Sequence, residues 1–101
     1  MCGIVGFCNL SNADFFVDQC LLENMQKAIE HRGPDGYRIW KSDQHQIGIA
    51  HRRLSIIDLS DAGFQPMIDD NLVVCCNGEI YNHFSLKNQV PNYFQTLLRF
   101  P

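Results

Sequence analysis

The sequence predicts an α+β fold, on two observations. Short apolar and β-branched runs separated by polar turns outnumber the one stretch with helical periodicity. The apolar runs at residues 2–8 and 72–76 are continuous, which is typical of strands that are buried on both faces. Strands of this kind need helices packed against them, so a layered arrangement of sheet and helix is expected.

The first two elements are a strand at residues 2–8 and a helix that begins at Val17 and ends near His31. The helix is predicted because apolar residues recur with helical spacing at positions 17, 20, 21, 25, 28 and 29. Gly33 and Pro34 end it, since proline disfavours a helical residue before it.

The rest of the chain is expected to be mostly extended. Its elements are, in order, strands at 37–41 and 46–51 joined by a turn at 42–45, an extended piece at 54–57, a loop at 60–66, a strand at 72–76 and a short helix after Asn82. No internal repeat or linker divides the 101 residues, which suit one small domain at most.

Charge and cysteine content exclude several classes of protein. The net charge is −3 and no basic run extends beyond Arg52 and Arg53, which argues against nucleic acid or an anionic membrane as a partner. No apolar run approaches the roughly 18–20 residues of a membrane span, and the start lacks the basic residues of a secretion signal, so a cytoplasmic location is expected. An odd number of cysteines does not suit a disulfide framework, and four are expected to be buried free thiols: Cys8, Cys20, Cys75 and Cys76.

Cys2 is the first candidate for catalysis. Removal of Met1 would give Cys2 a free α-amine, a group with a usual pKa of about 7.7–8.0 that can accept the thiol proton near neutral pH. A cysteine at position 2 can equally be incidental. However, an apolar strand that starts directly at the chain terminus is unusual, because termini are commonly frayed and polar.

Two further segments suit a substrate that carries an amide and a carboxylate. Asn77 and Gly78 follow a predicted strand, where a side-chain amide and a backbone N–H can converge on one oxyanion; a plain Asn-Gly turn is the alternative. Arg53 lies between apolar segments and offers a fork for a carboxylate; a structural ion pair is the alternative. Arg52 is expected to point the other way, as a solvated surface charge.

Four motifs in order establish a resemblance to a known family. The chain starts with MCGIVGF, and HRGPDG, HRRLSIIDLSDAGFQPM and NGEIYN follow. Together they resemble the glutaminase domain of glutamine-hydrolysing asparagine synthetases, a class II amidotransferase domain among the N-terminal-nucleophile hydrolases. The resemblance runs from residue 1 to about residue 83, and residues 84–101 form a divergent tail. Amidotransferases that make phosphoribosylamine or glucosamine phosphate start similarly but differ at the later motifs.

The resemblance implies a role for each matching residue. Cys2 is the implied nucleophile with its own α-amine as base, and Asn77 and Gly78 are the implied oxyanion hole. The implied contacts to L-glutamine are made by Arg53 to the carboxylate, by Leu54, Ser55, Ile56 and Ile57 along the pocket, and by Asn77, Gly78 and Glu79, the last to the α-amine. The implied reaction releases glutamate and ammonia through a cysteinyl thioester, and the ammonia serves asparagine biosynthesis. No metal or cofactor is expected in this chain, because ATP and Mg²⁺ belong to a separate synthetase domain of the family.

The resemblance also implies a fold that this chain does not complete. The family fold is a four-layer α-β-β-α sandwich, and its domain is roughly twice as long as this chain, which would form the amino-terminal half. The family has a second acidic ligand for the glutamine α-amine, whereas no Asp or Glu follows Glu79 here. The tail is therefore interpreted as a truncated or frameshifted reading frame, and the chain is expected to be inactive alone.

Other interpretations remain open from the sequence. The chain could be a glutaminase that takes its missing half from another chain, another class II amidotransferase, or a regulatory or interaction fragment that pairs with a full-length synthetase without catalysis. A small metal-binding module is disfavoured, because the sequence has no C-x-x-C motif and no close pair of histidines.

Overall fold

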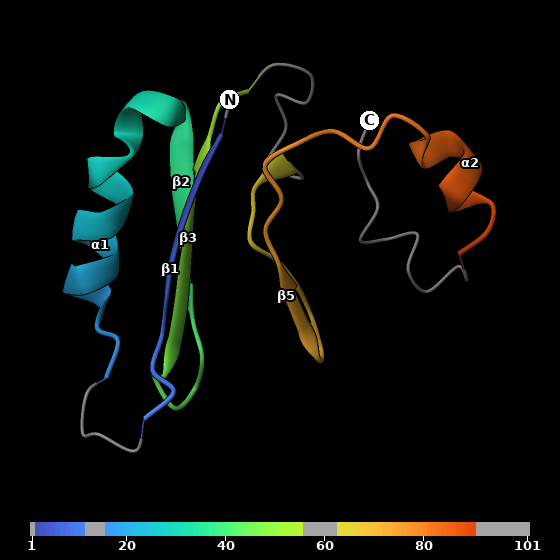
Figure 1. The fold of residues 1–101 in the computed structure, drawn as a ribbon. Helices are drawn as coiled ribbons and strands as arrows, with labels where there is room; N and C mark the ends of the chain where they lie inside the picture. The colour runs from blue at the N-terminus through green and yellow to red at the C-terminus, as the bar shows by residue number, and fades with distance from the viewer. Residues whose placement is uncertain (1, 12–15, 56–62, 91–101) are drawn as a thin grey trace.

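The computed structural model describes residues 2–11, 16–55 and 63–90 as a small α+β structure (Figure 1), which confirms the predicted class. The elements are, in order, β1 (Gly3–Cys8), α1 (Gln19–Ala28), the 3-10 helix η1 (Glu30–Arg32), β2 (Gly36–Lys41), β3 (Ile47–Arg53), β4 (Met67–Asp69), β5 (Leu72–Val74) and α2 (His83–Lys87). The strands form two antiparallel sheets, one with the order β1-β3-β2 and one made of β4 and β5.

The three-stranded sheet is organised around β3. Gly3 of β1 lies opposite Arg52, and Gly36 of β2 lies opposite Arg53. Both neighbouring strands run antiparallel to β3, so the starts of β1 and β2 meet the end of β3 at one end of the sheet. Three segments that are distant in the sequence are therefore brought together there.

Helix α1 covers one face of this sheet, while the β4-β5 hairpin and α2 lie on the other side of it (Figure 1). Asp18 caps α1, and its carboxylate accepts a hydrogen bond from the Leu21 N–H at 2.6 Å. Val17 and Leu22 are fully buried. A Cβ atom on Gly48 would lie 2.7 Å from a methyl group of each, so the glycine allows these side chains to pack directly on β3.

The buried positions of α1 are shifted by about one residue along the sequence from the predicted positions. Leu22 and Gln26 are the buried residues of the helix, whereas Cys20 is exposed and Met25 is half-buried. The apolar pattern did not identify this face because Gln26, a polar residue, occupies one of its buried positions.

Two expectations about burial were wrong. The runs at 2–8 and 72–76 are not buried on both faces, since Ile4 is 39% exposed, Leu72 52% and Val74 46%. The physical reason is that α1 covers a single face of the first sheet, and the described residues place no comparable helix on the second. Cys8 and Cys20 are exposed and Cys75 and Cys76 half-buried, so none of these four thiols is fully buried.

The remaining elements follow the predicted order. The strand expected at 72–76 ends at Val74, and the short β4 that pairs with it was not predicted. Helix α2 starts directly after Asn82, as expected. None of the described helices is long and apolar enough to cross a membrane. The described ranges also contain no group of three or more His, Cys, Asp or Glu residues that could hold a metal ion.

Candidate active site

Cys2 lies at the end of the sheet where β3 finishes. The Leu54 backbone N–H donates a hydrogen bond to Cys2 Sγ at 3.4 Å, and Sγ lies 3.9 Å from the Leu54 carbonyl oxygen. The antiparallel register causes this contact, because Gly3 pairs with Arg52 and the residues beyond the pair continue side by side. The structure thus brings the predicted nucleophile against the predicted glutamine-binding segment.

Arg53 is the last residue of β3, one position before Leu54, and it is 5% exposed. The Phe64 ring lies under its guanidinium, with 4.8 Å between Arg53 Cζ and the ring centroid. A buried guanidinium one residue before the Leu54 backbone that contacts the thiol suits the predicted role of a carboxylate ligand.

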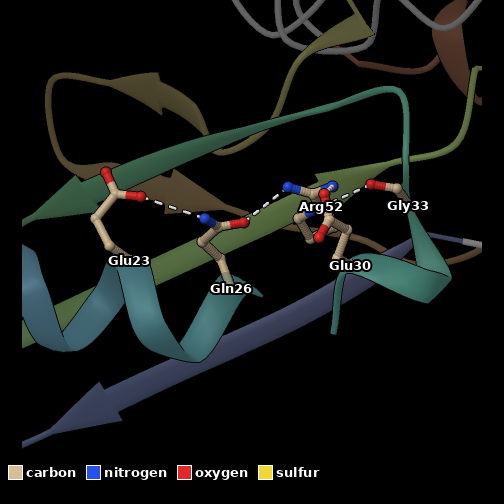
Figure 2. A network of polar contacts seen from close by, with 5 residues as sticks. All are labelled: Glu23, Gln26, Glu30, Gly33 and Arg52. Carbon is tan, nitrogen blue, oxygen red and sulfur yellow. Dashed lines mark hydrogen bonds and ion pairs between the residues drawn. The ribbon is translucent and has the colours of Figure 1, made fainter. Parts of the chain in front are cut away.

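Arg52 is not the solvated surface charge that the sequence suggested. It is 4% exposed, because α1 and η1 cover the sheet face toward which it points (Figure 2). Its Nε donates to the Gly33 carbonyl at 2.8 Å, Nη1 to Gln26 Oε1 at 2.8 Å and Nη2 to Glu30 Oε1 at 3.2 Å. Gln26 donates in turn to Glu23 at 3.2 Å. This network joins β3 to α1 through Gln26, and to η1 and the residue after it through Glu30 and Gly33.

The segment at residues 31–35, which begins within η1, holds the backbone around the site, a role that its sequence did not reveal. The Asp35 carboxylate accepts a hydrogen bond from the Ser55 N–H at 2.7 Å, and the Asp35 N–H donates to the Arg53 carbonyl at 3.0 Å. Arg32 Nε donates to the Cys2 carbonyl at 3.3 Å. The only signal in the sequence was the cluster of polar residues around a rigid Gly-Pro pair.

The predicted oxyanion segment follows β5 and is exposed. Asn77, Gly78 and Glu79 are exposed, and a Cβ atom on Gly78 would meet no heavy atom within 4 Å. Within the described ranges, no hydrogen bond or ion pair joins these three residues to Cys2. The preceding residue is anchored, because the Cys76 N–H donates to the Gln65 side-chain carbonyl.

Leu54 and Ser55 of the predicted pocket are half-buried beside Cys2 and Asp35. Ile56 and Ile57 lie outside the described residues. The structure therefore assembles Cys2, Arg53, Leu54 and Ser55 at one end of the sheet, while the roles of Asn77, Gly78 and Glu79 stay predictions.

Two titratable groups have shifted pKa values: His51 on β3, which the sequence did not single out, and Cys75 after β5. His51 of β3 is 1% exposed, and neither ring nitrogen has a hydrogen-bond partner. Burial, and secondarily the charge of Arg53, lowers the pKa of His51. Burial, and then the neighbouring Cys76, raises the pKa of the Cys75 thiol to about 11. Both side chains are thereby held in their neutral forms near neutral pH.

Comparison with known families gives one match that spans nearly the whole chain. Residues 1–97 match the family described as the glutamine amidotransferase domain. The chain therefore belongs to the glutamine amidotransferase domain family, which is a family of enzymes.

The individual relatives are long proteins of which this chain spans a small part. It is 41% identical to a glutamine-hydrolysing asparagine synthetase of Bacillus subtilis (strain 168), covering 92% of this chain and 12% of that protein. It is 39% identical to the nodule asparagine synthetase of Pisum sativum, and the match covers 92% of this chain and 16% of that protein. It is 43% identical to the amidase chry2 of Gibberella zeae, and the match covers 73% of this chain and 11% of that protein. No solved structure matches the chain.

Proposed function

We propose that this chain supplies the nucleophile and the carboxylate-binding part of a site that hydrolyses the side-chain amide of L-glutamine. The observation that carries the proposal is the contact between Cys2 Sγ and the Leu54 N–H, one residue beyond the buried Arg53. A thiol and a guanidinium at one end of a sheet suit a substrate with an electrophilic carbonyl at one end and a carboxylate at the other.

The proposed reaction has two steps. After removal of Met1, the Cys2 α-amine accepts the thiol proton while Sγ attacks the amide carbon of glutamine. The tetrahedral intermediate collapses as the C–N bond breaks and the nitrogen takes up the proton, which releases ammonia and leaves a γ-glutamyl thioester. Water then attacks the thioester carbon, the C–S bond breaks, and glutamate leaves while the thiol regains a proton.

Each of the other predicted site residues has a proposed contact with the substrate. Arg53 binds the glutamine carboxylate, the Leu54–Ser55 backbone lines the pocket, and Ile56 and Ile57 extend it. Asn77 and Gly78 donate to the oxyanion and Glu79 binds the α-amine, which requires this exposed segment to be held beside Cys2. The part of a glutaminase domain that would hold it there is proposed to come from a longer protein or a second chain, as one half of a four-layer sandwich.

The asparagine synthetases among the relatives support a further step in the same proposal. The ammonia is proposed to serve asparagine synthesis in a cytoplasmic synthetase domain that uses ATP and Mg²⁺, with no cofactor bound by this chain. The match to an amidase favours a second candidate, in which the released ammonia goes to another acceptor. A regulatory fragment without catalysis is the alternative that keeps the fold but not the reaction.

A test of the nucleophile uses the purified chain and a diazo-ketone analogue of glutamine. Intact mass should show that Met1 is removed, and peptide mapping should place the analogue on Cys2. The exposed Cys8 and Cys20 provide internal controls, because a neutral alkylating agent should reach them whereas the amino-acid analogue should not. Retention of Met1 throughout, or modification of Cys75 or Cys76 in preference to Cys2, would contradict the assignment.

A further inference from the structure

We propose that Phe64 is a positioning residue that orients the Arg53 guanidinium for the carboxylate of the substrate. This inference rests on the proposed function, because Arg53 is its carboxylate ligand. Phe64 lies eleven positions after Arg53, within the motif HRRLSIIDLSDAGFQPM, but the sequence analysis assigned it no role.

The Phe64 ring is held where β2 and β3 pair. It lies 4.8 Å from Arg53 Cζ and 5.4 Å from Arg38 Cζ, measured to the ring centroid. Gly36 pairs with Arg53, and a Cβ atom on Gly36 would lie 3.0 Å from two carbons of the ring. Gly36 also has a φ of +152°, a conformation that L side chains rarely adopt. Because Gly36 has no side chain, the Phe64 ring can pack directly against the backbone at position 36.

The contact with Phe64 restricts the orientation of the Arg53 guanidinium and therefore of its N–H donors. A ring over the face of a guanidinium attracts its charge, while the N–H groups point outward in the guanidinium plane, where a carboxylate accepts two parallel hydrogen bonds. Arg53 is 5% exposed, so this attraction is weakened little by water. Without the ring the guanidinium would lose one of the contacts that hold it, and the substrate would have to supply that part of its ordering, which weakens binding.

Arg38 adds a second positive charge beside the same ring. Arg38 pairs with His51, and His51 and Arg53 are two residues apart on β3, so all three side chains project from the same face of the sheet. Arg38 is exposed, in contrast to Arg53. Its proposed contribution is the local positive potential, which attracts an anionic substrate group.

The experiment measures saturable modification of Cys2 by the glutamine diazo-ketone analogue in the full chain. Phe64→Leu should raise the analogue concentration needed for half-maximal rate by about three- to tenfold, with the maximal rate unchanged. Phe64→Tyr, which keeps the ring, should restore binding. Alkylation of Cys2 by iodoacetamide, which has no carboxylate, should be equal in all variants.

Two controls separate positioning from folding. Phe84→Leu removes a ring that is 72% exposed on α2, and it should leave the analogue binding unchanged. Phe64→Leu should add little to the defect of Arg53→Lys, because both changes remove the same contact.

Unchanged half-maximal concentration in Phe64→Leu, or full additivity with Arg53→Lys, would overturn the inference and leave the proposed function standing. If the analogue fails to modify Cys2 in the unaltered chain while iodoacetamide does, the proposed function fails and the inference with it.

Discussion

Arg52 and Arg53 show how one position in a strand separates two roles. Their side chains project to opposite faces of β3, and both are buried. Arg52 is fully engaged by the helix side through Gly33, Gln26 and Glu30. Arg53 lies on the other face against Phe64. The first is therefore expected to determine stability and the second to determine substrate binding.

Arg52→Lys is expected to destabilise the fold by about 1–3 kcal/mol, because one ammonium cannot satisfy three acceptors arranged around a guanidinium. Urea unfolding followed by circular dichroism measures the change. Glu30→Gln is the matched control: Glu30 is 59% exposed, so the loss of its charge should cost less than about 1 kcal/mol. Equal effects of both substitutions would mean that the ion pair stabilises the structure, rather than the backbone and amide acceptors.

His51 predicts how stability depends on pH. Its pKa is lowered in the folded protein, by burial first and by Arg53 second, so the unfolded chain binds more protons at and below its usual pKa of about 6.5. The contribution of the neutral imidazole is present above that pH, and stability falls as the pH drops below it.

The measurement compares the free energy of unfolding at pH 7.5 and pH 5. His51→Leu should reduce the difference between the two values, since the variant has no imidazole to protonate. His45→Gln provides a control for the loss of an exposed histidine. A pH dependence that is the same in His51→Leu and in the unaltered chain would show that other groups cause it.

At the scale of elements, α1 is held by a narrow contact with β3. Leu22 is fully buried, and its methyl groups occupy the space left by Gly48, whereas the adjacent Leu21 is only half-buried. Leu22→Ala is expected to cost about 2–4 kcal/mol, because it removes buried methyl groups and leaves a cavity. Leu21→Ala should cost clearly less. Thermal unfolding of the two variants measures the difference, and a larger effect at Leu21 would contradict the orientation of the helix.

Local periodicity predicted the elements better than their contacts. The strand at 2–8, the strand pair around the 42–45 turn and the helix at 83–87 depend on short-range preferences, which the sequence displays. The face of α1 and the burial of Arg52 depend on each other: Gln26 of α1 is buried where it accepts a hydrogen bond from Arg52 of β3, between the helix and the sheet. No property of either residue alone predicts that pairing.

The candidate site was predictable in its parts and not in its assembly. The family motifs supplied Cys2 and Arg53, but their approach is a consequence of the β1-β3 register. Asp35 was unpredictable in another way, because it acts on the backbone of Ser55, and a backbone contact leaves no pattern in the sequence. Phe64 is placed beside Arg53 because its ring packs against Gly36, and this contact is a property of the fold.

At the scale of the whole molecule, one end of the three-stranded sheet is ordered while the second sheet and α2 present apolar side chains to solvent. The exposed large side chains in this part include Ile68 (57%), Leu72 (52%), Tyr81 (89%) and Phe84 (72%). Asn77, Gly78 and Glu79 belong to the same part of the chain, between β5 and α2. The proposed oxyanion donors are thus carried by the less buried part of the molecule, and the proposed nucleophile by the better packed part.

This division predicts that the isolated chain hydrolyses glutamine slowly. Cys2 and Arg53 are assembled, whereas Asn77 and Gly78 are exposed and a Cβ atom on Gly78 would meet no heavy atom within 4 Å, so packing does not fix the two proposed oxyanion donors. The loss of one oxyanion donor costs about 10²–10³ in kcat. We therefore expect glutamate release at least about a hundredfold slower than that of an intact glutaminase such as the Bacillus subtilis relative.

The assay measures glutamate release from L-glutamine by the purified chain, with Cys2→Ala as the control for contaminating activity. Asn77→Ala supplies the decisive comparison. If the oxyanion donors are not assembled, this substitution should change the residual rate by less than about twofold, whereas a working oxyanion hole would lose about a hundredfold or more. Rapid turnover that both Cys2→Ala and Asn77→Ala abolish would show that the segment from Asn77 to Glu79 closes over Cys2 when glutamine binds, and that these residues suffice for catalysis without a further part of the domain.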